Sequence, residues 1–317
     1  MSSTMQQKAI LVIGMHRSGT SAVSGLLAEM GVFMGKTLFA AQKGVNEKGF
    51  YENSELVGVN ELILDRLLWS WDDPLAASMD KYLPELDNAI ENKGRRIIAS
   101  DYKNQSAWGM KDPRTTLLLP FWQKVIDQSN IEATYILMIR SPLEVYASLK
   151  KRDGFSLEKS LMLWINYTLS GYFNSVDKNL FVLAYERLLS NPQVVARELA
   201  MVASLDVEFD PDSLNFIDKK LKNQANINAP KTPLTSIALK LFDAFTEPTV
   251  NHAKVLETAA EYSKFKNNLS PVLIEHLISL KKEEVHFRHL FMKAYQSYWW
   301  KVSWPVKMLE QWLSKDK

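Results

Sequence analysis

The stretch that decides the fold is AILVIGMHRSGTSAVSGLLAEM, residues 9–30. It opens with an unbroken apolar run that ends at Gly14, a pattern typical of a buried strand in a parallel sheet. From residue 20 onward, apolar side chains recur every three or four positions, which predicts a helix that ends near Gly31. A strand, a glycine loop and a helix in this order indicate an α/β nucleotide-binding fold.

The loop between the predicted strand and helix has the skeleton of a phosphate-binding loop. Gly14 and Gly19 are five positions apart, so backbone N–H groups can converge on phosphate oxygens at the positive end of the helix. A triphosphate-binding loop needs Lys directly after the second glycine, and Thr20 stands there instead. The cation of the loop is Arg17, which favours a 5′-phosphate that carries a further group. We predict nucleotide contacts from His16, Arg17, Ser18, Gly19, Thr20 and Ser21.

Two readings without a ligand stay open for this loop. A glycine-rich turn can join a strand to a helix for geometry alone. His16 taken by itself is typical of a residue that packs inside the loop.

The rest of the chain alternates strands and helices as far as residue 205. This alternation implies a parallel sheet with right-handed crossovers. We predict an α/β fold, a P-loop-like parallel sheet flanked by helices, with the core in residues 1–205 and a mainly helical C-terminal part in residues 206–317. Strands are predicted at residues 107–110, 134–139 and 180–183, helices at 54–68, 82–98, 120–128, 142–152, 156–176, 185–189, 193–204 and 255–296, and loops at 36–53 and 223–233.

The composition is that of an ordinary globular protein, 46% hydrophobic and 23% charged over 317 residues. The net charge of +2 gives no support for general nucleic-acid binding. Cys is absent, which excludes disulfides and thiol catalysis. Four of the five His lie in the last 66 residues, so a multi-histidine metal site in the first three quarters is excluded. No apolar stretch reaches the roughly 18 residues of a membrane span, so we expect a soluble, cytoplasmic protein.

A second anion site is predicted where the strand at residues 134–139 ends. Arg140 follows this strand directly, at the edge where open α/β sheets bind ligands. Ser148 lies eight positions later, just over two helical turns, so a guanidinium and a hydroxyl can hold one phosphate. The structural alternative is an ion-pair or capping role for Arg140 and a packing role for Ser148. Together with the glycine loop, this site suits a nucleotide with phosphate groups at both ends of its ribose.

These motifs resemble those of the sulfotransferases that use 3′-phosphoadenylyl sulfate (PAPS). Residues 13–21 resemble the 5′-phosphosulfate loop of the family, in which Lys or Arg precedes Ser-Gly-Thr, and Arg140 with Ser148 resembles its 3′-phosphate motif. The family often has Asp four positions after that Arg, where Glu144 stands here. Residues 184–192 resemble a further segment of the family that follows a core strand. The resemblance implies PAPS as the donor and no requirement for a metal.

A third segment adds a candidate catalytic residue. Residues 108–114, WGMKDPR, are similar to the Lys-Asp-Pro segment of tyrosylprotein sulfotransferases and related bacterial enzymes, where the lysine faces the transferring group. The resemblance therefore implies a catalytic role for Lys111, and a surface lysine before a turn is the alternative. Sulfuryl transfer, like phosphoryl transfer, depends on positioning and electrostatics. Arg17 and Lys111 are the cations expected at the sulfuryl and bridging oxygens.

The acceptor hydroxyl must lose a proton to a general base. We predict that this base is Glu52, in a loop expected to cover the crevice, with Glu47, Glu55 and His16 as rivals. The alternative for Glu52 is an exposed loop carboxylate or a charge at the N-terminus of the next helix.

The acceptor is predicted to be a carbohydrate or glycolipid. Phe50, Tyr51, Trp69 and Trp71 are candidates for stacking on a sugar ring, although aromatic side chains at helical spacing more often belong to the core.

The C-terminus is rich in tryptophan and basic. Residues 281–317 carry eight Lys or Arg against four Asp or Glu. This composition predicts peripheral docking at the inner membrane face or on a partner, with burial against the main domain as the alternative. The four C-terminal tryptophans are Trp299, Trp300, Trp304 and Trp312.

The sequence leaves two other functions open. One is a P-loop nucleotide kinase with a displaced cation, against which Thr20 argues. The other is a non-catalytic nucleotide-binding protein, against which Arg17, Lys111 and a candidate base argue together.

Overall fold

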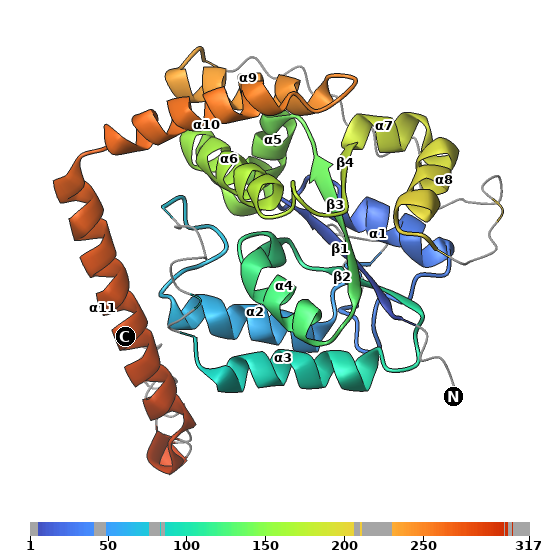
Figure 1. Cartoon of the computed structure of the whole chain (residues 1–317). Coiled ribbons are helices and arrows are strands. Elements are labelled where there is room, and N and C mark those ends of the chain that lie inside the picture. The colour runs from blue at the N-terminus through green and yellow to red at the C-terminus, as the bar shows by residue number, and fades with distance from the viewer. Residues whose placement is uncertain are drawn as a thin grey trace, which may run out of the picture. The chain divides into compact units, whose positions relative to one another are not determined.

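Four parallel strands form the central sheet, as predicted (Figure 1). They run in the order β2-β1-β3-β4, so β1 is interior and pairs with β2 from Lys8↔Ala107 and with β3 from Lys8↔Glu132. Because all four strands are parallel, their carboxyl ends share one edge of the sheet, and the segments that follow them meet there. The strands are β1 (Lys8–Gly14), β2 (Ala107–Lys111), β3 (Glu132–Ile139) and β4 (Leu180–Ala184).

The computed structural model describes residues 6–40, 49–75, 83, 86–205, 210, 230–300, 302–303 and 306. The chain forms two compact units, Met1–Lys264 and Phe265–Lys317. The first unit contains the sheet, and compact packing in it extends well past residue 205. The functional division proposed at that residue stays a prediction.

Helices connect the strands, and the α/β class with a helical C-terminal region is confirmed (Figure 1). The break between α10 and α11 coincides with Pro271, which stands at the first position of α11, so residues 255–296 form two helices. The helices are α1 (Thr20–Glu29), α2 (Ser54–Arg66), α3 (Asn88–Asp101), the 3₁₀ helix η3 (Pro113–Thr116), α4 (Leu119–Gln128), α5 (Pro142–Asp153), α6 (Leu157–Phe173), α7 (Tyr185–Ser190), α8 (Pro192–Val202), α9 (Pro233–Thr246), α10 (His252–Asn267) and α11 (Pro271–Gln296).

The core lies on both faces of the sheet, because successive side chains of β1 and β3 point to opposite sides. On one face, Ile10 and Val12 pack in a cluster with residues of α1 and α8. On the other face, α6 approaches so closely that a Cβ added at Gly171 would lie 2.9 Å from Leu137 Cδ1. Burial on both faces explains why β1 has an unbroken apolar sequence.

The largest differences from the sequence prediction concern α3 and α9. The helix expected over residues 82–98 begins at Asn88, because the Asp87 side chain caps it by accepting from Ala89 N at 2.9 Å, and it continues to Asp101. The sequence analysis does not predict α9, although Thr232 caps this helix and Pro233 begins it. Residues 223–229 of the predicted loop lie outside the described residues. None of the described helices is long and apolar enough to cross a membrane.

Candidate active site

The loop after β1 has a backbone that only glycine tolerates at two points. Gly14 has φ +137°, and a Cβ there would lie 2.7 Å from Met138 O. Gly19 has φ +93°, and its Cβ would lie 2.3 Å from Tyr185 Cδ2. The two glycines therefore set the shape of the loop, and α1 begins directly after the second one, at Thr20.

Arg17 meets the second predicted anion site at the carboxyl edge of the sheet. Its Nε donates to Ser148 Oγ at 2.7 Å, and Arg140 Nη1 donates to the carbonyl oxygen of Arg17 at 3.0 Å. The structure thus brings together the loop after β1 and the segment after β3. Arg140 also forms an ion pair with Glu144 at 2.9 Å, which agrees with the structural alternative for this residue.

The Tyr185 ring supports both halves of this cluster. It contacts the backbone at Gly19, and the Arg140 guanidinium lies over it at 4.4 Å from the ring centroid. Burial, and then the charges of Arg152 and Arg140, lower the pKa of Arg17. Cations held this close together favour an anion between them.

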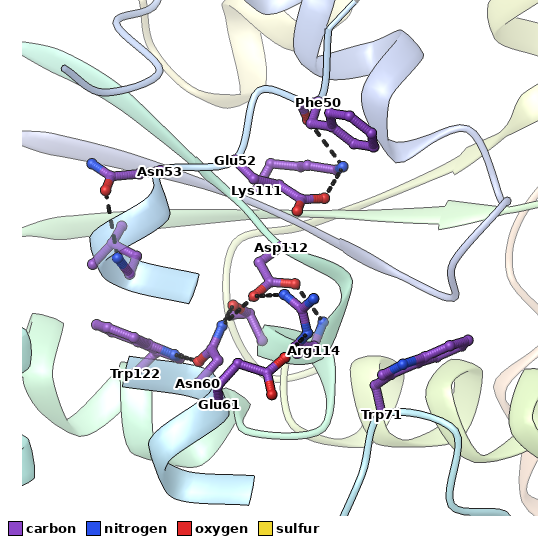
Figure 2. A network of polar contacts seen from close by, with 12 residues as sticks. Phe50, Glu52, Asn53, Asn60, Glu61, Trp71, Lys111, Asp112, Arg114 and Trp122 are labelled. Atoms are coloured by element: carbon purple, nitrogen blue, oxygen red, sulfur yellow. Dashed lines mark hydrogen bonds and ion pairs between the residues drawn. The ribbon is translucent and has the colours of Figure 1, made fainter. Parts of the chain in front are cut away.

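Lys111 lies at the end of β2 and is buried, which excludes the reading as a surface lysine. The register Val12↔Lys111 places it beside the end of β1. Its Nζ lies 2.6 Å from Glu52 Oε1 and donates to Phe50 O at 3.0 Å (Figure 2). Lys111 Nζ also donates to Ser21 Oγ at 3.0 Å. Lys111 therefore joins the first turn of α1 to the segment that contains the predicted base.

Glu52 is held by backbone pairing as well as by Lys111. Its carbonyl accepts from Phe39 N at 3.0 Å, and its side chain is only 12% exposed, unlike a free loop carboxylate. Asn53 directly after it caps α2 by accepting from Glu55 N at 3.0 Å. Of the rival bases, Glu55 is exposed, and Glu47 lies outside the described residues.

The Lys111–Glu52 pair is shifted toward its neutral forms by its surroundings. Burial raises the pKa of Glu52 and lowers the pKa of Lys111, and in each case it outweighs the attraction of the partner. A carboxylate with a raised pKa is a better proton acceptor than an exposed one.

His16 packs against aromatic rings, which agrees with the packing alternative. Its ring centroid lies 4.4 Å from that of Trp71 and 6.0 Å from that of Tyr167. Burial, and then the charge of Arg114, place the pKa of His16 well below its ordinary value, so this residue is neutral. Within the described residues, His16 Nε2 and Ser18 Oγ are buried without a hydrogen-bond partner.

Trp71 stands in a segment fixed on α6. Tyr167 Oη donates to the carbonyl of Trp71 at 2.7 Å, the Phe155 ring stacks on the indole at 5.8 Å, and the Arg152 guanidinium lies over it at 5.2 Å. Trp71, Trp69, Phe50 and Tyr51 are all half-buried.

Four residues of this region were not predicted as part of the site. Asp112 and Arg114 stood in the quoted motif around Lys111 but were not assigned a role. Tyr185 likewise stood in the quoted segment after β4. Asn60 has no sequence signal, because it lies inside an amphipathic helix. Among the described residues, no group of three or more His, Cys, Asp or Glu is placed to hold a metal ion.

No protein-family model and no curated protein matches the chain. Among solved structures, the sulfotransferase domain of the Synechococcus PCC 7002 olefin synthase is 15% identical with a TM-score of 0.38, over 81% of this chain and 95% of that domain. The sulfotransferase domain of the curacin biosynthetic pathway is 14% identical with a TM-score of 0.47, over 75% and 98%. A sulfotransferase from Alicyclobacillus acidocaldarius is 12% identical with a TM-score of 0.39, over 78% and 93%.

Proposed function

We propose that the protein is a sulfotransferase that moves a sulfuryl group from PAPS to a hydroxyl of a carbohydrate or glycolipid. The observation that carries this proposal is the meeting of two predicted anion sites, in which Arg17 Nε contacts Ser148 Oγ at 2.7 Å and Arg140 contacts the Arg17 backbone. The Lys111–Glu52 pair adjoins the same loop through Ser21. An ordinary role at the protein surface does not explain why Arg17, Arg140 and Lys111 lie near one another and near a mostly buried carboxylate.

The residues around the glycine loop fit a donor with several anionic groups. The loop ends at the N-terminus of α1, whose backbone N–H groups favour anions. Ser18 Oγ is a buried hydroxyl without a partner in the described residues, and a donor oxygen is a suitable acceptor for it. In this proposal Arg140 and Ser148 hold the 3′-phosphate, and Arg17 lies beside the 5′-phosphosulfate.

PAPS supplies the sulfur that bonds to the acceptor oxygen, and its bond from sulfur to the phosphate oxygen breaks to leave adenosine 3′,5′-bisphosphate. Lys111 and Arg17 place positive charge where negative charge develops. Glu52 Oε1 accepts the proton of the acceptor hydroxyl, and its burial favours that role. The bond from Lys111 to Phe50 O keeps the segment of the base against the site.

The acceptor class is proposed from the aromatic segment. Trp71 is half-buried next to His16 of the donor loop, so part of its indole can still contact a substrate. Indole faces bind the apolar faces of sugar rings, which supports a carbohydrate or glycolipid acceptor.

Calorimetric titration tests the donor site. Adenosine 3′,5′-bisphosphate is expected to bind without magnesium, and tighter than adenosine 5′-phosphate by on the order of 10–100-fold, since hydrogen bonds to a charged group contribute about 1.5–3 kcal/mol. Arg140→Met should remove most of this difference. Lys150→Met is the matched control, because Lys150 is exposed on α5, the helix that follows Arg140 and carries Ser148. Magnesium-dependent binding of ATP that equals or exceeds that of the bisphosphate would favour the kinase instead.

We also propose that the C-terminal unit docks on an anionic membrane surface, which would make the protein peripheral at the inner face. Tyr298 and Trp299 are 76% and 79% exposed, and the basic sequence around them complements anionic lipid. Trp304 and Trp312 lie outside the described residues. Deleting residues 298–317 should abolish co-sedimentation with phosphatidylglycerol vesicles and leave the melting temperature unchanged. Retained co-sedimentation, or collapse of the fold, would contradict docking.

A further inference from the structure

Two polar contacts join α2 and the segment directly before it to the end of β2. The first is the Glu52–Lys111 pair at 2.6 Å. The second is formed by the next residue of the β2 segment, Asp112, whose Oδ2 accepts from Asn60 Nδ2 at 2.7 Å (Figure 2). Because both contacts connect the same two segments, the second one constrains the distance across the first.

Asn60 is fully buried, and its amide uses both ends. Nδ2 donates to Asp112 Oδ2 and to Thr115 Oγ1, the latter at 3.0 Å, while Oδ1 accepts from Trp122 Nε1 at 2.7 Å. A buried amide with these partners has one orientation and holds α2 in one register.

Asp112 is 1% exposed, and both of its carboxylate oxygens accept hydrogen bonds. Its Oδ1 accepts from Arg114 N at 3.0 Å, and its Oδ2 also accepts from Arg114 Nη1 at 3.1 Å. Arg114 is held in turn by Glu61 at 2.8 Å. The carboxylate of Asp112 is therefore immobile, directly after Lys111 in the chain.

The start of α2, next to Glu52, is also tied to α3. Asn53 Nδ2 donates to Asp101 Oδ2 at 3.0 Å and to Tyr102 Oη at 3.2 Å. These contacts tie α2 to α3, whereas Asn60 ties it to β2. Besides the Glu52–Lys111 pair, the contacts of Lys111 Nζ with Phe50 O and of Arg114 with Glu61 also hold this segment on the end of β2. The Asn60–Asp112 contact is the one that joins two fully buried side chains.

We propose that Asp112 is a positioning residue for the transfer reaction: held by Asn60, it sets the approach of Glu52 to Lys111 and places a negative charge next to Lys111. The role of Asp112 in the transfer reaction rests on the proposed function. Its contact with Asn60 and the effect of its charge on Lys111 do not.

The charges facing Lys111 agree with this role. Glu52 and Asp112 both raise the pKa of Lys111, against the lowering by burial, and the charge of Arg114 lowers it further. The charge of Asp112 also raises the pKa of Glu52, and that of Arg114 lowers it. Glu61 neutralises part of Arg114 from the exposed side. Removing the charge of Asp112 should therefore lower the pKa of both members of the pair.

Asp112→Asn tests the proposal. The pKa values of Lys111 and Glu52 are measured by NMR titration of the Lys Cε and Glu Cδ resonances, assigned with Lys111→Met and Glu52→Gln. Both midpoints should move to lower pH. The melting temperature should fall by several degrees, because the NH₂ group of the new amide must face a donor, either Asn60 Nδ2 or Arg114 N. Turnover should fall roughly tenfold or more with donor affinity unchanged, since only the transfer step depends on the Asn60–Asp112 contact.

The exchange variant Asn60→Asp with Asp112→Asn separates the charge of Asp112 from its contact with Asn60. It restores a donor opposite an acceptor, so the melting temperature should return most of the way to that of the wild type, while the Lys111 midpoint stays low. Asp101→Asn, which weakens the contact of Asn53 with α3, is the control and should leave the Lys111 midpoint unchanged. An Lys111 midpoint that does not move in a folded Asp112→Asn protein overturns the inference.

Failure of the proposed function gives a different result. In that case the wild type does not bind adenosine 3′,5′-bisphosphate, although the NMR midpoints still move as described. If the wild type binds and turns over normally, and Asp112→Asn turns over at the wild-type rate, the positioning role alone is wrong.

Discussion

Glu52→Gln should lower turnover by a factor on the order of 10²–10⁴, the usual contribution of a positioned general base. Gln has nearly the shape of Glu and can still accept a hydrogen bond from Lys111 Nζ, which lies 2.6 Å from Oε1 of the native residue. It cannot take a proton from the acceptor hydroxyl. Affinity for adenosine 3′,5′-bisphosphate should stay within a few fold of the wild type, because Arg17, Arg140 and Ser148 are untouched. A screen over glycans, glycolipids and tyrosine peptides first supplies the acceptor for the rate measurement.

The pH dependence gives an independent check on Glu52. Its pKa is raised above the ordinary 4.5, and the base acts in its deprotonated form, so kcat/KM in the wild type should rise with pH through a limb centred above 4.5. The limb should disappear in Glu52→Gln. Glu55→Gln is the matched control, since Glu55 is exposed only three positions away and should keep both rate and limb. Near-normal turnover of Glu52→Gln would remove Glu52 from the mechanism.

Lys111→Met should lower turnover about as much as Glu52→Gln does, and it should lower stability more. Removing a preorganised positive group from a reaction centre lowers kcat by on the order of 10²–10³. The change also leaves Glu52 mostly buried without its cation, and breaking a buried pair in this way costs about 3–5 kcal/mol of unfolding free energy. Denaturant unfolding measures this loss, and a discontinuous assay of sulfated product measures turnover.

The double variant Glu52→Gln with Lys111→Met separates the two effects. With the carboxylate gone as well, most of the stability should return, because a buried pair can be replaced by neutral groups at little cost. Turnover should remain as low as in the worse single variant. A Lys111→Met protein that is both stable and active would contradict the placement of Lys111 at the reaction centre.

The sheet and the meeting of the two predicted anion sites could be inferred from physical rules. β1 is buried on both faces, so its sequence is apolar without interruption, and the neighbouring strands show shorter versions of the same signal. Arg17 and Arg140 each follow a parallel strand, and parallel strands end at a common edge. That rule places them together even though they are more than a hundred positions apart in the chain, as the contact at 3.0 Å shows.

The contact between Asn60 and Asp112 could not be predicted from the sequence in the same way. Asn60 lies in a helix whose other buried positions are largely apolar, and a buried Asn has meaning only when its partners are known. Asp112 and Trp122 become its partners through tertiary packing, which no local pattern records. The sequence does not predict α9 for a different reason. Thr232 and Pro233 form a helix start, but a proline after a polar stretch is also typical of the end of a loop.

The packing of Tyr185 against Gly19 has a consequence for the order of events during synthesis. The glycine loop precedes β4 in the chain, yet the ring that lies against the loop and under Arg140 directly follows β4. A nascent chain that ends before residue 185 therefore lacks one wall of the loop after β1. This loop can make all of its contacts only after β4 and Tyr185 have been synthesised.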